Sequence, residues 1–200
     1  YNSRLEMLKK ENERGPIYAS GGETLAVTRI DADGLEYRSY PYGSAFSHIV
    51  GFESRGYMGT EALANYYLLH SHESLRGQVS NAIYGRKNAG DGVYTTLDVN
   101  LQLAAYEALG ENNGAVIVTN PSTGEILAMV SKPDFDPNTL KEIWEGIVVD
   151  KDNSVLLNRA TQGHYAPGST FKIVTTLEYV RENDGDTQAY QYNCDGLFEA

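Results

Sequence analysis

Short apolar runs separated by glycine-containing turns dominate the first half of the chain. Two such runs, at 17–19 and 24–27, flank the turn-forming residues 20–23 (SGGE), and this arrangement predicts a β-hairpin. The preceding residues, 1–14, are mostly polar and predict a helix or linker that leads into the body. Further on, apolar residues recur at helical spacing after Thr60, which predicts a helix capped by that threonine. Its predicted apolar face consists of Leu63, Tyr66, Tyr67 and His70.

The second half of the chain has a different pattern, which begins after the small polar stretch 87–92 (KNAGDG). Two glycines in that stretch indicate a domain boundary. Beyond it, Asp98 is expected to cap a helix that ends at Gly110. The apolar runs 115–118 and 126–130 flank a Pro/Gly turn and predict two strands in the middle of a sheet covered on both sides. The predicted apolar face of the helix consists of Leu101, Ala104, Ala105 and Ala108.

A last helix is predicted to open at Ser169 and to end near residues 184–185. The order of elements, in which a hairpin and loops lie between helices, favours a mixed α/β architecture over a helical bundle. No internal repeat or low-complexity tract interrupts it. The apolar residues expected to face inward from this helix are Phe171, Ile173, Val174, Leu177 and Val180.

Length and charge narrow the class of protein. The 200 residues are 41% hydrophobic and 22% charged, which suits one medium domain or two small ones with a buried core. The formal net charge of −11 repels nucleic acid and anionic membrane surfaces, so we expect no nucleic-acid partner. No stretch approaches the roughly 20 apolar residues of a membrane-spanning helix.

The cysteine and histidine residues give no expectation of a metal site or a cofactor. Cys194 is the single cysteine and cannot form an internal disulfide. His70 and His72 lack the i, i+4 spacing of a helical metal pair, and we interpret them as surface histidines. Asp134 and Asp136 lie in a segment with two prolines, which favours a rigid turn over an acid/base pair.

One motif, at residues 167–172 (PGSTFK), has a catalytic interpretation. Pro167 and Gly168 turn the chain and place Ser169 in the first turn of the predicted helix, where free backbone N–H groups stabilise negative charge. Lys172 projects from the same face, and burial together with the positive end of the helix dipole favours a neutral amine that accepts a proton. A serine hydroxyl is a weak nucleophile without such a base. We therefore predict Ser169 as nucleophile and Lys172 as general base.

The S-x-x-K spacing alone is weak evidence, because a pair of common residues three positions apart arises easily by chance. The alternative interpretation is an N-capping serine followed by a solvated lysine. A phosphate-binding loop and a G-x-S-x-G nucleophile motif are both excluded by the sequence. Gly163 and Gly168 resemble half a phosphate-binding loop, but Ser169 stands where its lysine should be, and no G-x-S-x-G sequence occurs.

The S-x-x-K pair is the last in a series of motifs that follow one another along the chain. They are residues 14–17 (RGPI), 23–26 (ETLA), 40–51 (YPYGSAFSHIVG), 59–61 (GTE), 95–98 (TTLD) with Gln102, 120–129 (NPSTGEILAM), 136–138 (DPN), 158–160 (NRA) and 167–172. In these motifs the chain resembles the class B penicillin-binding proteins, D,D-transpeptidases that cross-link peptidoglycan. The resemblance covers nearly the whole chain, and the compact front end is similar to the penicillin-binding protein A type.

The resemblance implies a fold and a mechanism. The expected fold is α+β in more than one domain: a mixed, non-catalytic pedestal at residues 1–92, then the first part of a transpeptidase domain like that of serine β-lactamases at 93–200, with helices flanking an antiparallel sheet. Ser169 would attack the carbonyl between the two terminal D-alanines of a stem peptide and form an acyl-enzyme. Lys172 would accept the serine proton, and the Ser169 backbone N–H would serve in the oxyanion hole.

The same resemblance implies partners and a location. The expected ligands are peptidoglycan stem peptides ending in D-Ala-D-Ala and the β-lactams that mimic them. The pedestal would dock other cell-wall synthesis proteins. The protein would lie on the extracytoplasmic side of the bacterial cell membrane, held by a single-pass anchor that these 200 residues do not include.

Two motifs that the family needs, S-x-N and K-[ST]-G, do not occur in these residues. In the family both follow S-x-x-K, so we expect the chain to be a fragment that is inactive by itself. Two other interpretations stay open. The chain could belong to a β-lactamase or β-lactam sensor, which shares S-x-x-K, or it could act as a non-enzymatic scaffolding module of cell-wall synthesis.

Overall fold

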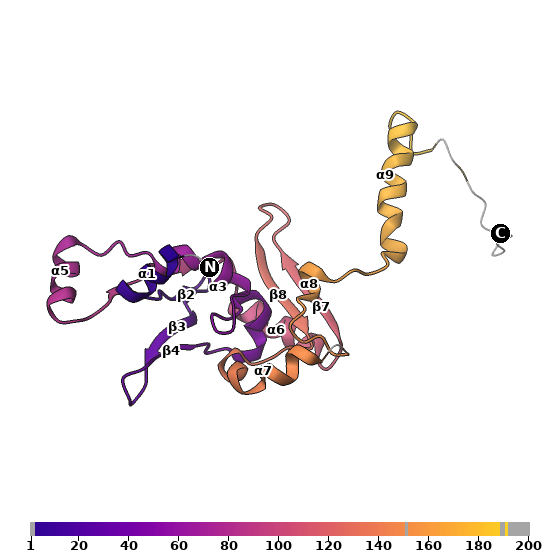
Figure 1. Cartoon of the computed structure of the whole chain (residues 1–200). Helices are drawn as coiled ribbons and strands as arrows, with labels where there is room; N and C mark the ends of the chain where they lie inside the picture. Colours follow the sequence, from indigo (N-terminus) through magenta and orange to yellow (C-terminus); the bar gives the residue numbers. More distant parts are fainter. Residues whose placement is uncertain (1–2, 151, 189–190, 192–200) are drawn as a thin grey trace. The chain divides into compact units, whose positions relative to one another are not determined.

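The computed structural model describes residues 3–150, 152–188 and 191, which leaves Cys194 outside the described part. The chain divides into two compact units, Tyr1–Gly163 and His164–Ala200, and each is described by itself. Among the described residues, helices and short strands alternate, as expected for an α+β fold. The elements follow one another in Figure 1 from indigo to yellow.

The first unit opens with a helix and a small mixed sheet. Helix α1 (Ser3–Glu11) lies in the polar N-terminal segment, for which a helix or a linker was predicted. It is followed by β1 (Asn12–Glu13), β2 (Ile17–Tyr18), β3 (Thr24–Ile30) and β4 (Glu36–Ser39). The predicted hairpin is confirmed, because β2 pairs antiparallel with β3. At its turn Gly22 has a φ of +92°, which glycine adopts without the steric cost of a side chain.

Four short helical segments follow: η1 (Gly43–Phe46), α2 (Ser47–Val50), α3 (Gly59–Leu63) and α4 (Asn65–Leu69). The prediction of one helix capped by Thr60 is wrong in two ways. The Thr60 hydroxyl donates to the carbonyl of Ile49 at 2.9 Å instead of capping, and a turn at Ala64 separates α3 from α4. The buried face also differs, since Leu63 is 88% exposed whereas Leu68 is fully buried.

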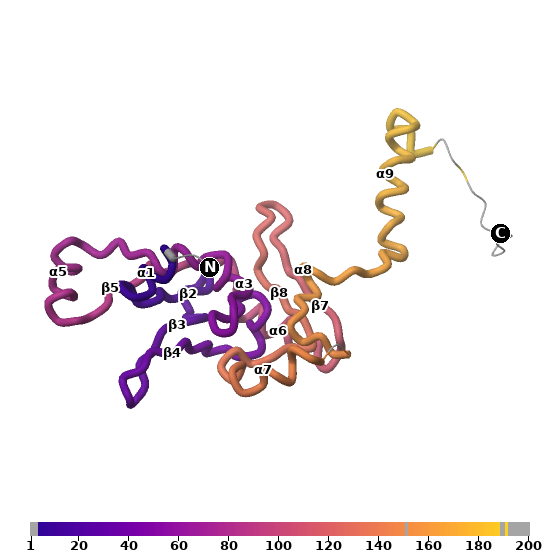
Figure 2. The backbone as a smooth tube through the Cα atoms, in the orientation of Figure 1, coloured from indigo at the N-terminus to yellow at the C-terminus, as the bar shows by residue number. Residues whose placement is uncertain are grey.

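A long excursion within the first unit, residues 70–91, begins after α4 and returns beside its starting point. It carries α5 (Leu75–Ile83) and ends in β5 (Asn88–Ala89), which pairs in parallel with β1. The tube in Figure 2 shows α5 at the far end of this loop and β5 next to the start of the chain. The chain then forms β6 (Val93–Tyr94), which adds in parallel to β2 and completes a sheet ordered β4-β3-β2-β6.

Helix α6 (Val99–Leu109) confirms the predicted cap and stop. The Asp98 carboxylate accepts from the Leu101 N–H at 2.9 Å, and Gly110 ends the helix with a φ of +55°. The predicted apolar face is partly wrong, because Leu101 is 39% exposed while Gln102 is fully buried. The Gln102 side chain binds the carbonyls of Ala45 and Met129, at 2.7 and 2.8 Å.

Two antiparallel strands, β7 (Gly114–Thr119) and β8 (Ile126–Lys132), form the predicted hairpin around the Pro/Gly turn. The expectation that both faces of both strands are covered is wrong for β7. Its residues alternate between half-buried and exposed, and Ile117 is 47% exposed. Strand β8 has four consecutive buried residues, 128–131, because α6 packs on it.

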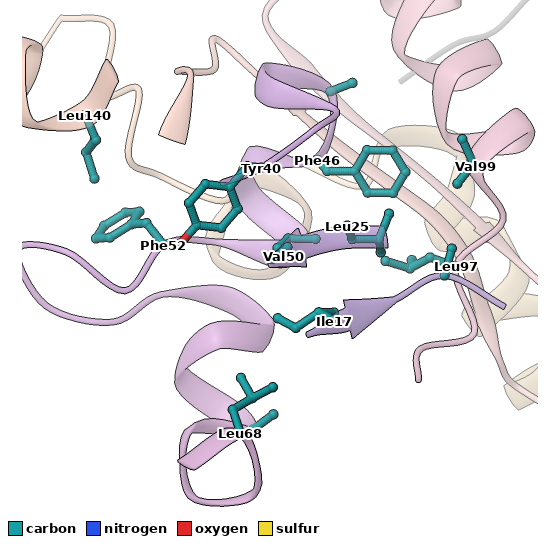
Figure 3. Packing of buried hydrophobic residues seen from close by; sticks show 14 of the residues in the cluster. Ile17, Leu25, Tyr40, Phe46, Val50, Phe52, Leu68, Leu97, Val99 and Leu140 are labelled. Atoms are coloured by element: carbon teal, nitrogen blue, oxygen red, sulfur yellow. The ribbon is translucent and has the colours of Figure 1, made fainter. Parts of the chain in front are cut away.

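The main core of the first unit combines residues from widely separated segments, as Figure 3 shows for Ile17, Leu25, Phe46, Leu68 and Leu140. Leu140 opens α7 (Leu140–Val149), which follows the short turn η2 (Pro137–Thr139). Asp136 caps that turn by accepting from the Asn138 N–H at 2.9 Å, which fits the turn-making role predicted for its segment. The unit ends with α8 (Arg159–Gln162).

The second unit contains a short 3-10 segment, η3 (Gly168–Phe171), that continues into α9 (Lys172–Glu182). The predicted helix is therefore present, but its apolar side chains are not inward-facing. Phe171, Ile173, Val174 and Leu177 are 52–66% exposed, and Val180 is half-buried. Within the described part of this unit no second element packs on α9, so an apolar stripe alone does not lead to burial.

Candidate active site

The structure places Ser169 and Lys172 on consecutive segments at a sharp turn of the second unit. Gly168 has a φ of +54°, a conformation that side chains rarely adopt, and η3 begins there. Ser169 is the second residue of η3, and Lys172 is the first residue of α9. Side chains three residues apart eclipse each other in a 3-10 helix, so the two groups project from the same side of the chain.

Both predicted catalytic residues are exposed. Among the described residues no hydrogen bond joins the Ser169 hydroxyl to the Lys172 amine. The burial that was expected to favour a neutral Lys172 is thus not present in this structure. What remains of the expected arrangement is the position of the lysine in the first turn of α9, next to the positive end of the helix dipole.

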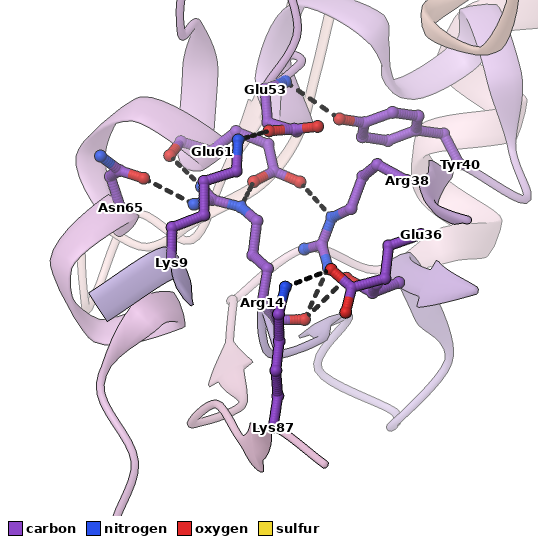
Figure 4. A network of polar contacts seen from close by, with 10 residues as sticks. Lys9, Arg14, Glu36, Arg38, Tyr40, Glu53, Glu61, Asn65 and Lys87 are labelled. Atoms are coloured by element: carbon purple, nitrogen blue, oxygen red, sulfur yellow. Dashed lines mark hydrogen bonds and ion pairs between the residues drawn. The ribbon is translucent and has the colours of Figure 1, made fainter. Parts of the chain in front are cut away.

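A buried charge network ties together the early motifs of the chain, and Figure 4 shows it at close range. Glu61 is fully buried and accepts from Arg14 Nε at 2.6 Å and from Arg38 Nε at 2.8 Å. Arg14 also donates to the Glu61 carbonyl at 2.7 Å and to Asn65 at 2.5 Å. Because two guanidinium groups compensate one buried carboxylate, the network holds α3 and α4 against the strands and has a structural role.

A second link joins the turn after Tyr40 to the DPN motif. The Asn138 side chain donates to the Tyr40 carbonyl and accepts from the Tyr40 N–H, both at 2.9 Å. Burial, followed by the nearby Glu61 carboxylate, raises the pKa of Tyr40, whose hydroxyl accepts from the Glu53 N–H at 3.1 Å. Sequence spacing could not reveal this pair, since 98 positions separate its members.

Tertiary structure also brings together three side chains that the sequence interpretation kept apart. His70, His72 and Asp91 each offer one ligand atom, and these atoms lie within 4.8 Å of one another. The interpretation of the two histidines as unrelated surface residues is therefore incomplete. Asp91 was missed because it lies after the α5 excursion, and the one sequence signal was its place in the glycine-containing stretch 87–92.

Comparisons with known proteins agree with this architecture. The family model described as "Penicillin binding protein A dimerisation domain" matches residues 14–93. The model described as "Penicillin binding protein transpeptidase domain" matches residues 114–191, the range that includes Ser169 and Lys172. The chain belongs to the class B penicillin-binding proteins. Its fold is a dimerisation-type N-terminal region followed by part of a transpeptidase domain.

Individual relatives support the same assignment. The "Peptidoglycan D,D-transpeptidase PbpA" of Mycolicibacterium smegmatis is 39% identical over 193 residues, which cover 88% of this chain and 39% of that protein. The "Peptidoglycan D,D-transpeptidase MrdA" of Escherichia coli is 33% identical over 181 residues, 72% of this chain and 28% of that protein. The chain thus spans about two fifths of the length of the first relative.

Solved structures give the same result. The imipenem acyl-enzyme complex of penicillin-binding protein A from Mycobacterium tuberculosis has a TM-score of 0.75 and 32% sequence identity, over 87% of this chain and 43% of that one. The penicillin G acyl-enzyme complex of the same protein also has a TM-score of 0.75. Among the described residues of this chain, no helix is long and apolar enough to span a bilayer.

Proposed function

We propose that the chain carries the pedestal and the first part of the catalytic domain of a peptidoglycan D,D-transpeptidase, with Ser169 as nucleophile and Lys172 as general base. One observation carries the proposal: the S-x-x-K pair sits at the Gly168 turn, inside the range that matches the transpeptidase family and after the ordered motifs of the pedestal. The proposal divides the chain near residue 92, after the pedestal (residues 1–92).

The proposed reaction starts at the Ser169 hydroxyl. Its Oγ attacks the carbonyl carbon between the two terminal D-alanines of a stem peptide while the Lys172 amine takes the hydroxyl proton. The C–N bond then breaks, the proton passes to the departing nitrogen, and free D-alanine leaves. An amino group of a neighbouring stem peptide then attacks the resulting ester while the Lys172 amine takes its proton. The ester C–O bond breaks, the proton passes to Ser169 Oγ, and the new amide bond is the cross-link. The Ser169 backbone N–H, at the start of a helix, stabilises the negative charge that develops on the carbonyl oxygen.

The local geometry supports these roles. An i, i+3 pair on η3 and α9 lets a flexible lysine reach the serine hydroxyl without any rearrangement of the backbone. Lys172 is the first residue of the 11-residue helix α9, so it lies at the positive end of the helix dipole. The proposed ligands are stem peptides ending in D-Ala-D-Ala and β-lactams, and the second class is named in the acyl-enzyme complexes of the relatives.

Labelled penicillin tests the proposal on the full-length protein. After saturation, peptide mass mapping should find one adduct, on Ser169, and Ser169→Ala should abolish it. Lys172→Gln should slow acylation by about 100-fold or more, the typical contribution of a general base. Ser122→Ala, in the exposed turn between β7 and β8, is the matched control and should label normally. An adduct on another residue would overturn the assignment. Rapid hydrolysis of penicillin would favour the β-lactamase alternative.

A second function is proposed for the pedestal: docking of other cell-wall synthesis proteins. It is favoured by one face of α5, where Leu75, Val79 and Ile83 recur at i, i+4 spacing and are 80%, 60% and 73% exposed. A double change, Leu75→Ser with Ile83→Ser, should impair rescue of a strain depleted of the protein while penicillin labelling of Ser169 persists. Val149→Ser, which alters a side chain 74% exposed elsewhere, should rescue normally. Normal rescue by the double variant would refute docking through this face.

The proposed location is the extracytoplasmic side of the bacterial cell membrane, with a single-pass anchor. The support is the similarity to enzymes that act on peptidoglycan, which lies outside that membrane. Protease added to intact spheroplasts should digest the protein, and a cytoplasmic marker should survive. Protection until the membrane is broken would contradict this location.

A further inference from the structure

A cluster of two imidazoles and one carboxylate lies at the base of the α5 excursion. His70 follows the last turn of α4, His72 is two residues further, and Asp91 follows β5 on the returning leg. The Nδ1 atom of His72 is 2.6 Å from Asp91 Oδ2, and Nδ1 of His70 is 3.3 Å from the same oxygen. The two imidazole rings have centroids 4.6 Å apart.

Backbone hydrogen bonds hold the three side chains in this arrangement. The Asp91 N–H donates to the His70 carbonyl at 2.8 Å, and the His72 N–H donates to Asp91 Oδ1 at 3.1 Å. The Asp91 carboxylate thus accepts from a backbone N–H with one oxygen and faces both imidazoles with the other. A carboxylate and neutral imidazole nitrogens are the forms that coordinate a metal.

The donor set points to a particular class of ion. Two imidazole nitrogens with one carboxylate oxygen suit zinc and neighbouring divalent transition metals, whereas calcium and magnesium prefer oxygen ligands. In a tetrahedral zinc site with bonds of about 2.1 Å, donor atoms lie about 3.4 Å apart. The His70 to Asp91 distance of 3.3 Å already matches this, and the His72 contact of 2.6 Å needs a small movement of one exposed side chain.

We propose that His70, His72 and Asp91 bind one divalent transition-metal ion of the zinc class, with water at the remaining coordination positions. The site is independent of the reaction proposed for Ser169. Binding of the ion joins the two legs of the α5 excursion, because His70 and His72 lie on the outgoing leg and Asp91 on the returning one.

Strand β1 already links the two ends of the α5 excursion by hydrogen bonds, and the proposed metal ion would add a second link close to it. The Asn12 amide donates at 2.8 Å to the carbonyl of Leu69, the last residue of α4, where the outgoing leg begins, and the Asn88 amide on the returning leg donates to Asn12 at 3.0 Å. A metal ion bound to His70, His72 and Asp91 would connect the two legs of the excursion at a second point. The expected consequence is slower exchange of backbone amides in residues 70–92 and a fixed direction for α5.

Titration of the full-length protein with zinc ion alone tests the proposal. Isothermal calorimetry should show one site that is lost or weakened at least about 10-fold by His70→Ala, His72→Ala and Asp91→Asn, since the loss of even a supporting group of a metal site costs that much. His164→Ala, at another exposed histidine, is the matched control and should bind like the parent. Cobalt ion should give visible absorption in the parent protein and in the control only.

Hydrogen exchange adds a readout that separates binding from a general effect on folding. Zinc should slow exchange in residues 70–92 of the parent and leave the Asp91→Asn variant unchanged. Equal zinc affinity in the parent and in the three cluster variants would overturn the proposal, as would the absence of any saturable binding. Because His72 has a side chain that is 80% exposed, His72→Ala should fold normally, so its loss of binding cannot be attributed to unfolding.

Discussion

One helix from each compact unit shows how differently apolar side chains are buried in this protein. In the first unit Leu68 of α4 is fully buried in a core that also contains Ile17 and Leu25, dozens of residues earlier in the chain. In the second unit Leu177 of α9 is 66% exposed, although apolar residues recur at helical spacing along that helix. Helical spacing therefore determines which residues share a face, but only a partner element turns that face into a core.

The first unit also contains a buried charge, whereas no charged side chain is buried among residues 164–188 and 191. Glu61 is fully buried because Arg14 and Arg38 approach it from β-strand and loop segments far away in the sequence. Such an arrangement needs several elements already packed in place, since an uncompensated buried charge is strongly destabilising. The contrast between the units is thus a contrast between non-local and local contacts, and substitutions can test it.

Glu61→Ala should have the largest effect, because it leaves two buried guanidinium groups without their carboxylate. We expect a loss of about 3–5 kcal/mol in the free energy of unfolding. Urea denaturation followed by circular dichroism measures it. The matched control is Glu36→Ala, which removes the partly exposed ion pair with Lys87 and should cost less than about 1 kcal/mol. Equal effects of the two changes would contradict the role given to the network.

Two leucine truncations compare the units directly. Leu68→Ala should lower the free energy of unfolding by about 2–5 kcal/mol, because it opens a cavity in the core. Leu177→Ala should change it by less than about 0.5 kcal/mol, as for an ordinary surface position. Thermal and urea denaturation of the same preparations give both values. A large loss for Leu177→Ala in the full-length protein would show that α9 has a covering partner there.

Removal of the α6 cap should have an intermediate effect. Asp98→Ala eliminates the carboxylate that accepts from the Leu101 N–H and should cost about 1 kcal/mol. Asp98→Asn retains an accepting oxygen and should restore most of that stability, which urea midpoints can resolve. If the alanine and asparagine variants are equally stable, the contribution of the cap is refuted.

The smallest effect depends on pH. Burial lowers the pKa of His48 from its ordinary value of 6.5, so His48 binds a proton more readily in the unfolded chain than in the folded chain. Stability should accordingly be constant above pH 6.5 and fall as the pH drops below it. Urea midpoints between pH 7.5 and 5.5 should show this decline, and His48→Gln should reduce it. An unchanged slope in the variant would assign the decline to other groups.

Local signals predicted the elements whose determinants are adjacent in sequence. The Gly-Gly hairpin between β2 and β3, the Asp98 cap and the Gly110 stop all depend on a few neighbouring residues, and each is present. Ordered motifs also sufficed to place the chain in its family. The roles of Ser169 and Lys172 stay predictions, because both side chains are exposed in this structure and no hydrogen bond between them is found among the described residues.

Long-range contacts account for what the sequence did not predict. Gln102 is buried in place of Leu101 because carbonyls of η1 and β8 are available to its amide. Thr60 bonds Ile49 rather than its own helix, and Asp91 meets His70 and His72 across the α5 excursion. In each case the partner is distant along the chain, so no local pattern records it.

The sequence by itself determined where some elements of this protein form, such as α6 and the hairpins β2–β3 and β7–β8, and which family it belongs to, because caps, glycine turns and motif order act over short distances. Only the tertiary structure decided which faces are buried, how one carboxylate is neutralised by two arginines and where three potential metal ligands meet. Those outcomes depend on the desolvation of groups by segments that are remote in sequence, and desolvation exists only once those segments have packed.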